Sequence, residues 1–163
     1  MPANPFDDAR DYAFNYLEET EGYVPDLLLE ADFDYPMTTT PIVDRLIETF
    51  FKDEEATNAG TVYPADPKFY TINPVINRLF PYFIDCLQHL DRQDYPPIYR
   101  RGPLLLTGLP LRSYSLGERF AYIIITPEEG LNVHDEDNLF LARCYMKRKL
   151  VKSGIEVTFL LFS

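Results

Sequence analysis

The sequence predicts a small α+β protein in which a helical layer packs against a short, mainly antiparallel sheet. Apolar residues recur at spacings of three and four in four segments, near residues 7–20, 41–55, 74–91 and 136–152, which is typical of amphipathic helices. Leu, β-branched and aromatic residues dominate three later segments, near residues 103–107, 119–126 and 155–162, which is typical of strands. With 163 residues, 46 % of them hydrophobic, the chain is long enough to bury one core.

Charge divides the chain into two parts. Residues 1–60 carry 15 acidic and 3 basic side chains, whereas residues 61–163 carry 11 and 12. From Asp11 to Asp44 there is no Lys or Arg, and the whole chain has a formal net charge of −11. Charge asymmetry of this kind bears on partners more than on fold. We therefore predict an acidic, Tyr- and Pro-rich N-terminal arm over residues 1–40, with a short helix, and a single α+β domain over residues 41–163.

Within the arm, the first helix begins at acidic residues and ends before glycine. Asp7 and Asp8 suit the positive end of a helix dipole, and Gly22 follows the last apolar residues of the pattern. Proline at 25 and at 36 brackets Leu27–Leu29, and residues before proline favour extended backbone. These leucines either pack on the chain's own domain or dock on a neighbouring protein.

The next two helices begin at proline. Thr40-Pro41 and Asn73-Pro74 each combine a capping side chain with proline at the first helical position. The residues between them predict a break near 58–60 and a loop over 61–71. The segment 74–91 has the widest apolar face and is the predicted central helix, kinked near Pro81.

The second half of the chain is predicted as strands around a final helix. Residues 119–126 contain consecutive β-branched residues, and a turn at 127–130 follows. Acidic residues open the segment 136–152 and basic residues close it, which matches the helix dipole, although a strand is the competing interpretation. The segment 155–162 is the last predicted strand.

No sequence motif indicates a cofactor, a metal or a catalytic centre. Cys86, His89, His134 and Cys144 are suitable zinc ligands, but their spacing is not that of a zinc site. Two buried, free thiols are the simpler interpretation and suit an intracellular protein. The chain has neither a G-x-G-x-x-G nor a phosphate-binding loop. We therefore expect no enzymatic activity, with a carboxylate-based hydrolase that lacks a linear motif as an alternative.

These features favour a structural subunit that docks in a larger complex or an oligomeric ring, such as a virion or a phage tail or neck component. We expect other protein subunits as partners, with a homo-oligomer or larger assembly, no direct nucleic acid and no membrane, since no segment is apolar enough to span one. The location is then cytoplasmic, or the virion. The acidic arm and the C-terminal strand are the predicted docking elements.

The predicted partner-binding residues combine the arm with the basic positions of the second part. They are Tyr23, Leu27, Leu28, Leu29, Asp32, Asp34, Tyr35, Arg100, Arg101, Lys147, Arg148 and Lys149. The alternative function is an acidic inhibitor or immunity-type protein that binds a basic, nucleic-acid-handling target, because dense carboxylates can neutralise a cationic cleft.

Overall fold

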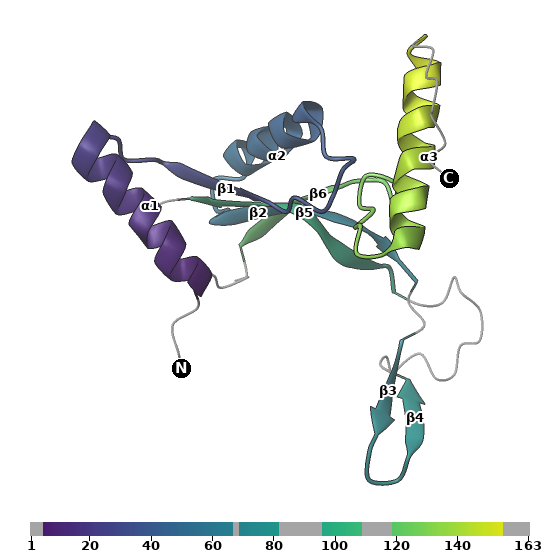
Figure 1. Ribbon diagram of the computed structural model, residues 1–163. Coiled ribbons are helices and arrows are strands. Elements are labelled where there is room, and N and C mark those ends of the chain that lie inside the picture. The colour runs from purple at the N-terminus through teal and green to yellow at the C-terminus, as the bar shows by residue number, and fades with distance from the viewer. Residues whose placement is uncertain (1–4, 67–68, 82–95, 109–118, 155–163) are drawn as a thin grey trace.

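A four-stranded sheet forms the centre of the molecule, with one helix on its face and a separate two-stranded hairpin (Figure 1). The computed structural model describes residues 5–66, 69–81, 96–108 and 119–154. The described elements are α1 (Pro5–Glu21), β1 (Leu27–Ala31), α2 (Thr40–Lys52), β2 (Asn58–Ala65), β3 (Tyr70–Asn73), β4 (Arg78–Pro81), β5 (Ile98–Gly108), β6 (Phe120–Ile124) and α3 (Glu136–Lys152). The predicted α+β class is confirmed.

The strand order is β1-β5-β2-β6. β1 and β2 both run antiparallel to β5, and β6 runs parallel to β2. β5 lies inside the sheet because its second half is apolar on both faces, and every residue from Gly102 to Thr107 is buried. The predicted strands near 103–107 and 119–126 therefore correspond to β5 and β6.

α2 covers one face of the sheet. It begins with Pro41 in its first turn, and its N-cap is Thr39, one residue before the expected Thr40. Ile42 and Leu46 are buried against the sheet. The core consists of Ile42, Leu46, Ala59, Leu104, Leu106, Ala121, Ile123 and Ile125.

The other two described helices stand away from the sheet. In Figure 1, α1 and α3 lie at opposite ends of the molecule, with the sheet and α2 between them. Their residues are mostly exposed, and Ala142 is the one buried residue of α3. Within the described residues, the predicted helical layer is thus a single helix, which corrects the expectation that all the helices pack on the sheet.

The break expected at 58–60 and the loop expected from 61 are wrong, because residues 58–65 form the inner strand β2. Small residues let neighbours approach: a Cβ at Gly60 would lie 2.5 Å from Cζ of Phe120. Pro64 is tolerated because β6 pairs with β2 only as far as Val62, which leaves Pro64 opposite β5 alone.

The helix predicted over 74–91 is wrong for residues 74–81, which form the turn and second strand of the β3–β4 hairpin. Oδ1 of Asn73 accepts hydrogen bonds from the backbone N–H of Val75 and Ile76, as an N-cap would. Asn77 then adopts the left-handed conformation, with φ of 49°, and the chain reverses. Residues 82–91 lie outside the described part, as does the predicted strand 155–162.

β1 places part of the predicted arm in the sheet. Leu27–Ala31 pair with β5, and Leu27 and Leu29 pack against the core. Of the two predicted alternatives, the structure therefore shows the first, packing on the chain's own domain. The helices expected near 7–20, 41–55 and 136–152 are present as α1, α2 and α3, so the competing strand over 137–152 is excluded.

Candidate interaction surfaces

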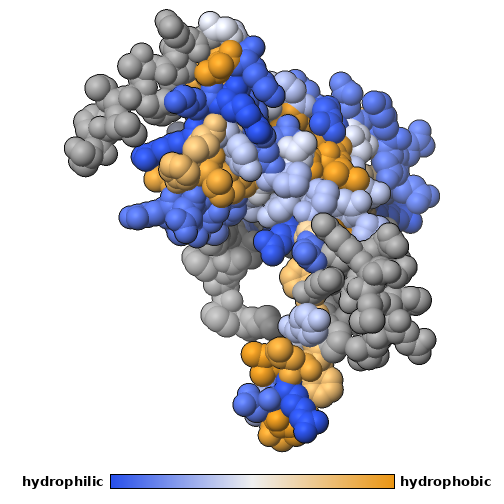
Figure 2. Space-filling model, turned by 90° about the vertical axis from the view of Figure 1, so that its right-hand side faces the viewer, coloured by the Kyte–Doolittle hydropathy of each residue, from blue (hydrophilic) through white to orange (hydrophobic). Residues whose placement is uncertain are grey.

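The β3–β4 hairpin presents an apolar face to solvent. Ile72 lies directly opposite Leu79, and Tyr70 lies opposite Pro81 on the same face. Ile72 is 67 % exposed and Leu79 is 65 % exposed. Figure 2 shows the hydrophobic residues of the hairpin below the body of the molecule, and Val75 and Ile76 extend the apolar surface into the turn. The other face carries Thr71, Asn73, Arg78 and Phe80, so the hairpin is amphipathic with its apolar side uncovered.

α1 presents an acidic and aromatic surface. The helix contains six acidic residues and one basic residue, and its last turn has no base. Tyr12 and Tyr16 are 72 % and 52 % exposed and stack with ring centroids 6.5 Å apart. Helical geometry places them on the side opposite the half-buried Phe14 and Leu17. This side of α1 is therefore accessible at Tyr12 and Tyr16.

α3 presents a basic surface in its second half. Its first turn carries Glu136 and Asp137, and five bases follow from Arg143 onward. Phe140, which precedes these bases, and Val151 are exposed, on the side of the helix opposite Ala142. Asp135 is the N-cap and accepts a hydrogen bond of 2.7 Å from the backbone N–H of Asn138.

Three contacts with Asp34 fix the loop before α3 to the rest of the protein. Asp34 accepts a hydrogen bond of 3.0 Å from the amide of Asn132, and its backbone oxygen accepts one of 2.9 Å from the N–H of Val133. Nε2 of His134 lies 3.5 Å from the Asp34 carboxylate. The acidic segment after β1 is thus tied to the loop before α3 within one chain.

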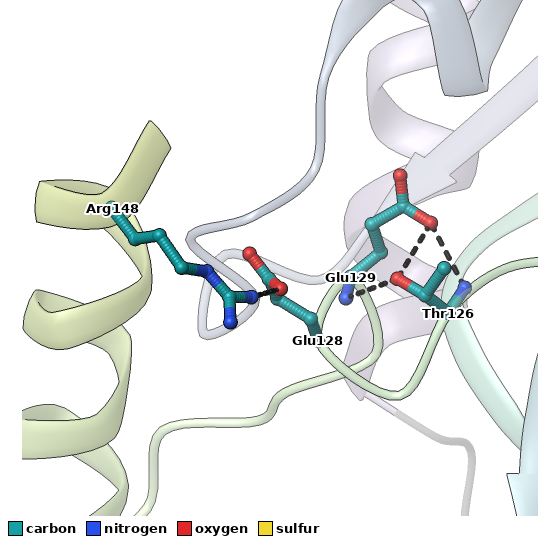
Figure 3. A network of polar contacts seen from close by, with 4 residues as sticks. All are labelled: Thr126, Glu128, Glu129 and Arg148. Carbon is teal, nitrogen blue, oxygen red and sulfur yellow. Dashed lines mark hydrogen bonds and ion pairs between the residues drawn. The ribbon is translucent and has the colours of Figure 1, made fainter. Parts of the chain in front are cut away.

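A further contact holds the second half of α3 (Figure 3). Arg148 donates a hydrogen bond to the carboxylate of Glu128 and lies over the ring of Tyr145, 5.1 Å from its centroid. The loop that carries Glu128 is itself closed by a reciprocal pair of bonds between Thr126 and Glu129, of 2.9 Å and 3.2 Å. Arg148 therefore positions α3 and is not available to a partner in this arrangement.

The predicted partner-binding residues are distributed over several elements. Tyr23 and Asp32 are exposed, Tyr35 is half-buried, and Leu27–Leu29 are half-buried in β1. Arg100 and Arg101 are exposed on β5, opposite Tyr63 and Val62 of β2. Lys147 and Lys149 are exposed on α3. Asp34 and Arg148 serve contacts within the chain, as described above.

Sequence reasoning did not identify the hairpin as a candidate surface. It also left out Tyr12 and Tyr16 on α1 as candidates for an interaction surface. The available signal for the hairpin was the turn chemistry of Asn73-Pro74 with Asn77 four residues after Asn73. That signal was assigned to a helix cap because the apolar residues after it also match a helical spacing.

The structure places the remaining candidate chemistry on the surface or outside the described residues. Cys144 is exposed, which corrects the expectation that it is buried, and Cys86 and His89 lie outside the described part. In the described ranges, no group of three or more His, Cys, Asp or Glu side chains is placed to hold a metal ion. None of the three described helices combines the length and hydropathy that a membrane span requires.

Comparison with known proteins found no family model that matches this chain and no matching curated protein.

Proposed function

We propose that this protein is a non-enzymatic structural subunit that docks in a larger protein assembly. The observation that carries the proposal is the uncovered apolar face of the β3–β4 hairpin, formed by Tyr70, Ile72 and Leu79. A two-stranded hairpin is marginally stable by itself in water and requires a hydrophobic contact on one face. Large exposed apolar patches on a protein mark surfaces that contact other proteins.

Burial of this face contributes part of the free energy of association, and further contacts supply the rest. Full burial of a side chain such as Ile72 or Leu79 contributes about 1.5–3 kcal/mol relative to exposure. The hairpin also projects away from the sheet in Figure 1, so it can enter a neighbouring subunit without displacing the core. An aromatic residue at the edge of the patch, Tyr70, is typical of contacts that dominate protein interfaces.

The acidic arm and the C-terminal segment complete the proposal. Tyr23 and Asp32 remain exposed beside β1, which suits a peripheral role in recognition. The segment 155–162 lies outside the described residues, and its sequence makes it a second candidate for docking. A ring or a virion, such as a phage tail or neck, is a setting in which a small subunit of this kind works, and the cytoplasm is its location before assembly.

The experiment replaces the paired hairpin residues with polar ones of similar strand propensity. We expect Ile72→Thr together with Leu79→Thr to leave the circular dichroism spectrum and the unfolding midpoint unchanged, because both side chains are exposed. At high salt, where charged contacts are screened, the mass measured by light scattering after size-exclusion chromatography falls to that of the monomer, because the apolar contact is lost. The same variant no longer binds any foreign subunit that wild-type protein captures.

A matched control changes two exposed apolar residues on the body of the protein, Phe51→Gln and Ile124→Thr. This control keeps the wild-type mass. The proposal fails if, at high salt, the hairpin variant assembles and binds as wild-type protein does.

One observation favours the acidic inhibitor as a second candidate. The acids of the last turns of α1 are exposed and the last turn of α1 has no base. This function predicts a one-to-one, salt-sensitive complex with a basic, nucleic-acid-handling protein, which is unaffected by the hairpin substitutions.

A further inference from the structure

Surfaces of opposite charge lie at opposite ends of the molecule. α1 is strongly acidic and α3 has a basic second half. Figure 1 shows the two helices separated by the sheet and α2. A single chain therefore cannot bring these two surfaces together, whereas two copies can.

The acidic surface lacks compensation within the chain. In the part of the chain that the structure describes, Glu18, Glu19 and Glu21 are exposed and form no ion pair. They also stand at the C-terminal end of α1, where the helix dipole is negative. External cations at this end relieve both the repulsion between the carboxylates and the unfavourable dipole.

The basic surface supplies such cations. Arg143, Lys149 and Lys152 are exposed on α3, and none forms an ion pair with another described residue. The Arg148–Glu128 contact holds this half of the helix in place, so these side chains are presented from a positioned element.

Each helix also exposes apolar side chains. Helical spacing places Glu19 beside the tyrosine pair and Arg143 beside Phe140, whereas Glu21 and Lys149 lie on the opposite sides of their helices. Tyr12 and Tyr16 form an exposed stacked pair on α1, and Phe140 and Val151 are exposed on α3. Helices that pack against each other bury apolar residues at spacings of three and four, with charges at the rim. Charge complementarity then sets which surface meets which, and in what order.

We infer that α1 of one copy docks on the basic half of α3 of a second copy, which joins the copies head to tail. The inference rests on the proposed assembly function and names its partner as a second copy of this chain. Because the two contact surfaces are different, each copy still has one free surface of each kind. Contacts of this type build closed rings or open filaments.

The alternative ligand for the α3 surface is nucleic acid. Its phosphates are repelled by a protein of net charge −11 whose excess of acid includes α1. The second copy brings the acidic surface at the same concentration as the basic one, and we therefore favour it. Binding of a short DNA duplex to α3 is measured as well, and it counts against the second copy as the partner if the copies do not associate.

The test reverses the charge of the α1 surface, of the α3 surface, and of both together. One variant carries Glu18→Lys, Glu19→Lys and Glu21→Lys, and a second carries Arg143→Glu, Lys149→Glu and Lys152→Glu. Glu and Lys have similar helix propensities, so both helices are retained. A third variant carries all six changes and keeps the net charge of −11. A control, Asp44→Lys with Glu54→Lys and Glu55→Lys, alters the net charge as the first variant does, at exposed positions on α2 and the loop after it.

Sedimentation velocity at low salt measures the association of each variant. The dissociation constant of each single-surface variant is higher than that of wild-type protein by about tenfold or more, because every α1–α3 contact then pairs like charges. The six-residue exchange restores association to the wild-type constant, and the control does not weaken it. An equimolar mixture of the two single-surface variants also associates, since their altered helices complement one another.

Two results overturn the inference. If wild-type protein associates and the single-surface variants associate equally well, or the exchange restores nothing, the α1–α3 contact is wrong while the proposed assembly function stands on the hairpin. If wild-type protein stays monomeric at about 100 μM, a second copy is not the partner of these surfaces. The same conclusion follows if α3 binds the DNA duplex while the copies do not associate. The hairpin variant then decides the proposed function separately, through binding to a foreign subunit.

Discussion

Thr61 is the residue on which the centre of the sheet depends most directly. It is fully buried, and its hydroxyl accepts a hydrogen bond of 2.9 Å from the backbone N–H of Leu104. The register between β2 and β5 shifts between Gly60 and Val62, so this N–H has no regular strand partner. Gly102 makes room for the arrangement, since a Cβ there would lie 2.5 Å from the Thr61 hydroxyl oxygen.

Thr61→Val keeps the shape of the side chain and removes its hydroxyl. We expect a loss of about 1–3 kcal/mol in the free energy of unfolding, because the buried N–H of Leu104 is left without an acceptor. Urea denaturation followed by circular dichroism measures the loss. Thr71→Val, at an exposed position of β3, serves as the control and changes stability by less than about 0.5 kcal/mol. Equal stability of the two variants would show that the hydroxyl is not needed.

Residue chemistry explains one wrong prediction. An Asn side chain that accepts hydrogen bonds from the next N–H groups begins a helix and an Asx turn in the same way. At Asn73 the outcome depends on Asn77, whose left-handed backbone reverses the chain. The spacing of Val75, Ile76, Leu79 and Phe80 does not distinguish these outcomes over so short a segment.

At the scale of the described elements, the predictions that succeeded are the three helices, β5 and β6, whereas β1 to β4 were missed and part of the hairpin was predicted as a helix. α3 has acids in its first turn and bases in its last, as predicted, and Asp135 is its N-cap. These signals are local. β1 and β2 depend on pairing with β5, which is distant in the sequence, and β2 contains Gly60 and Pro64, which local propensity disfavours.

Asp135→Ala tests the start of α3. We expect a loss of about 1 kcal/mol in helix stability, because the capping bond to Asn138 is removed. α3 has few contacts with the sheet, so the loss is local and is best measured as faster amide hydrogen exchange in the first turns of α3. Asp137→Ala removes a nearby acid that caps nothing and has a smaller effect. If both substitutions have an equal effect, Asp135 stabilises α3 through its charge at the helix dipole and not through the capping hydrogen bond.

At the scale of the molecule, the exposed surfaces have different physical characters. The hairpin contact is apolar, whereas the α1–α3 contact combines charge with a few aromatic and aliphatic side chains. Salt screens the second kind much more than the first, since the Debye length falls from about 10 Å at 0.1 M to about 3 Å at 1 M ionic strength. The proposed assembly therefore has a salt-sensitive and a salt-resistant part.

We expect association of the wild-type protein to weaken about tenfold between low and high salt without being lost. The hairpin variant, which retains only the charged contact, dissociates fully at high salt. Light scattering over a series of NaCl concentrations measures both. An assembly that strengthens with salt in both proteins contradicts the charged contact.

The sequence by itself determined the α+β class, the three described helices, β5 and β6, and the separation of charge along the chain. Each of these follows from local periodicity, capping residues or composition, which need no knowledge of distant contacts. Tertiary structure alone decided that Leu27–Ala31 joins the sheet, that Asn58–Ala65 is an inner strand and that the chain reverses at Asn77. It also decided which residues remain exposed, because a helical or apolar pattern shows that a face exists but not whether the fold covers it.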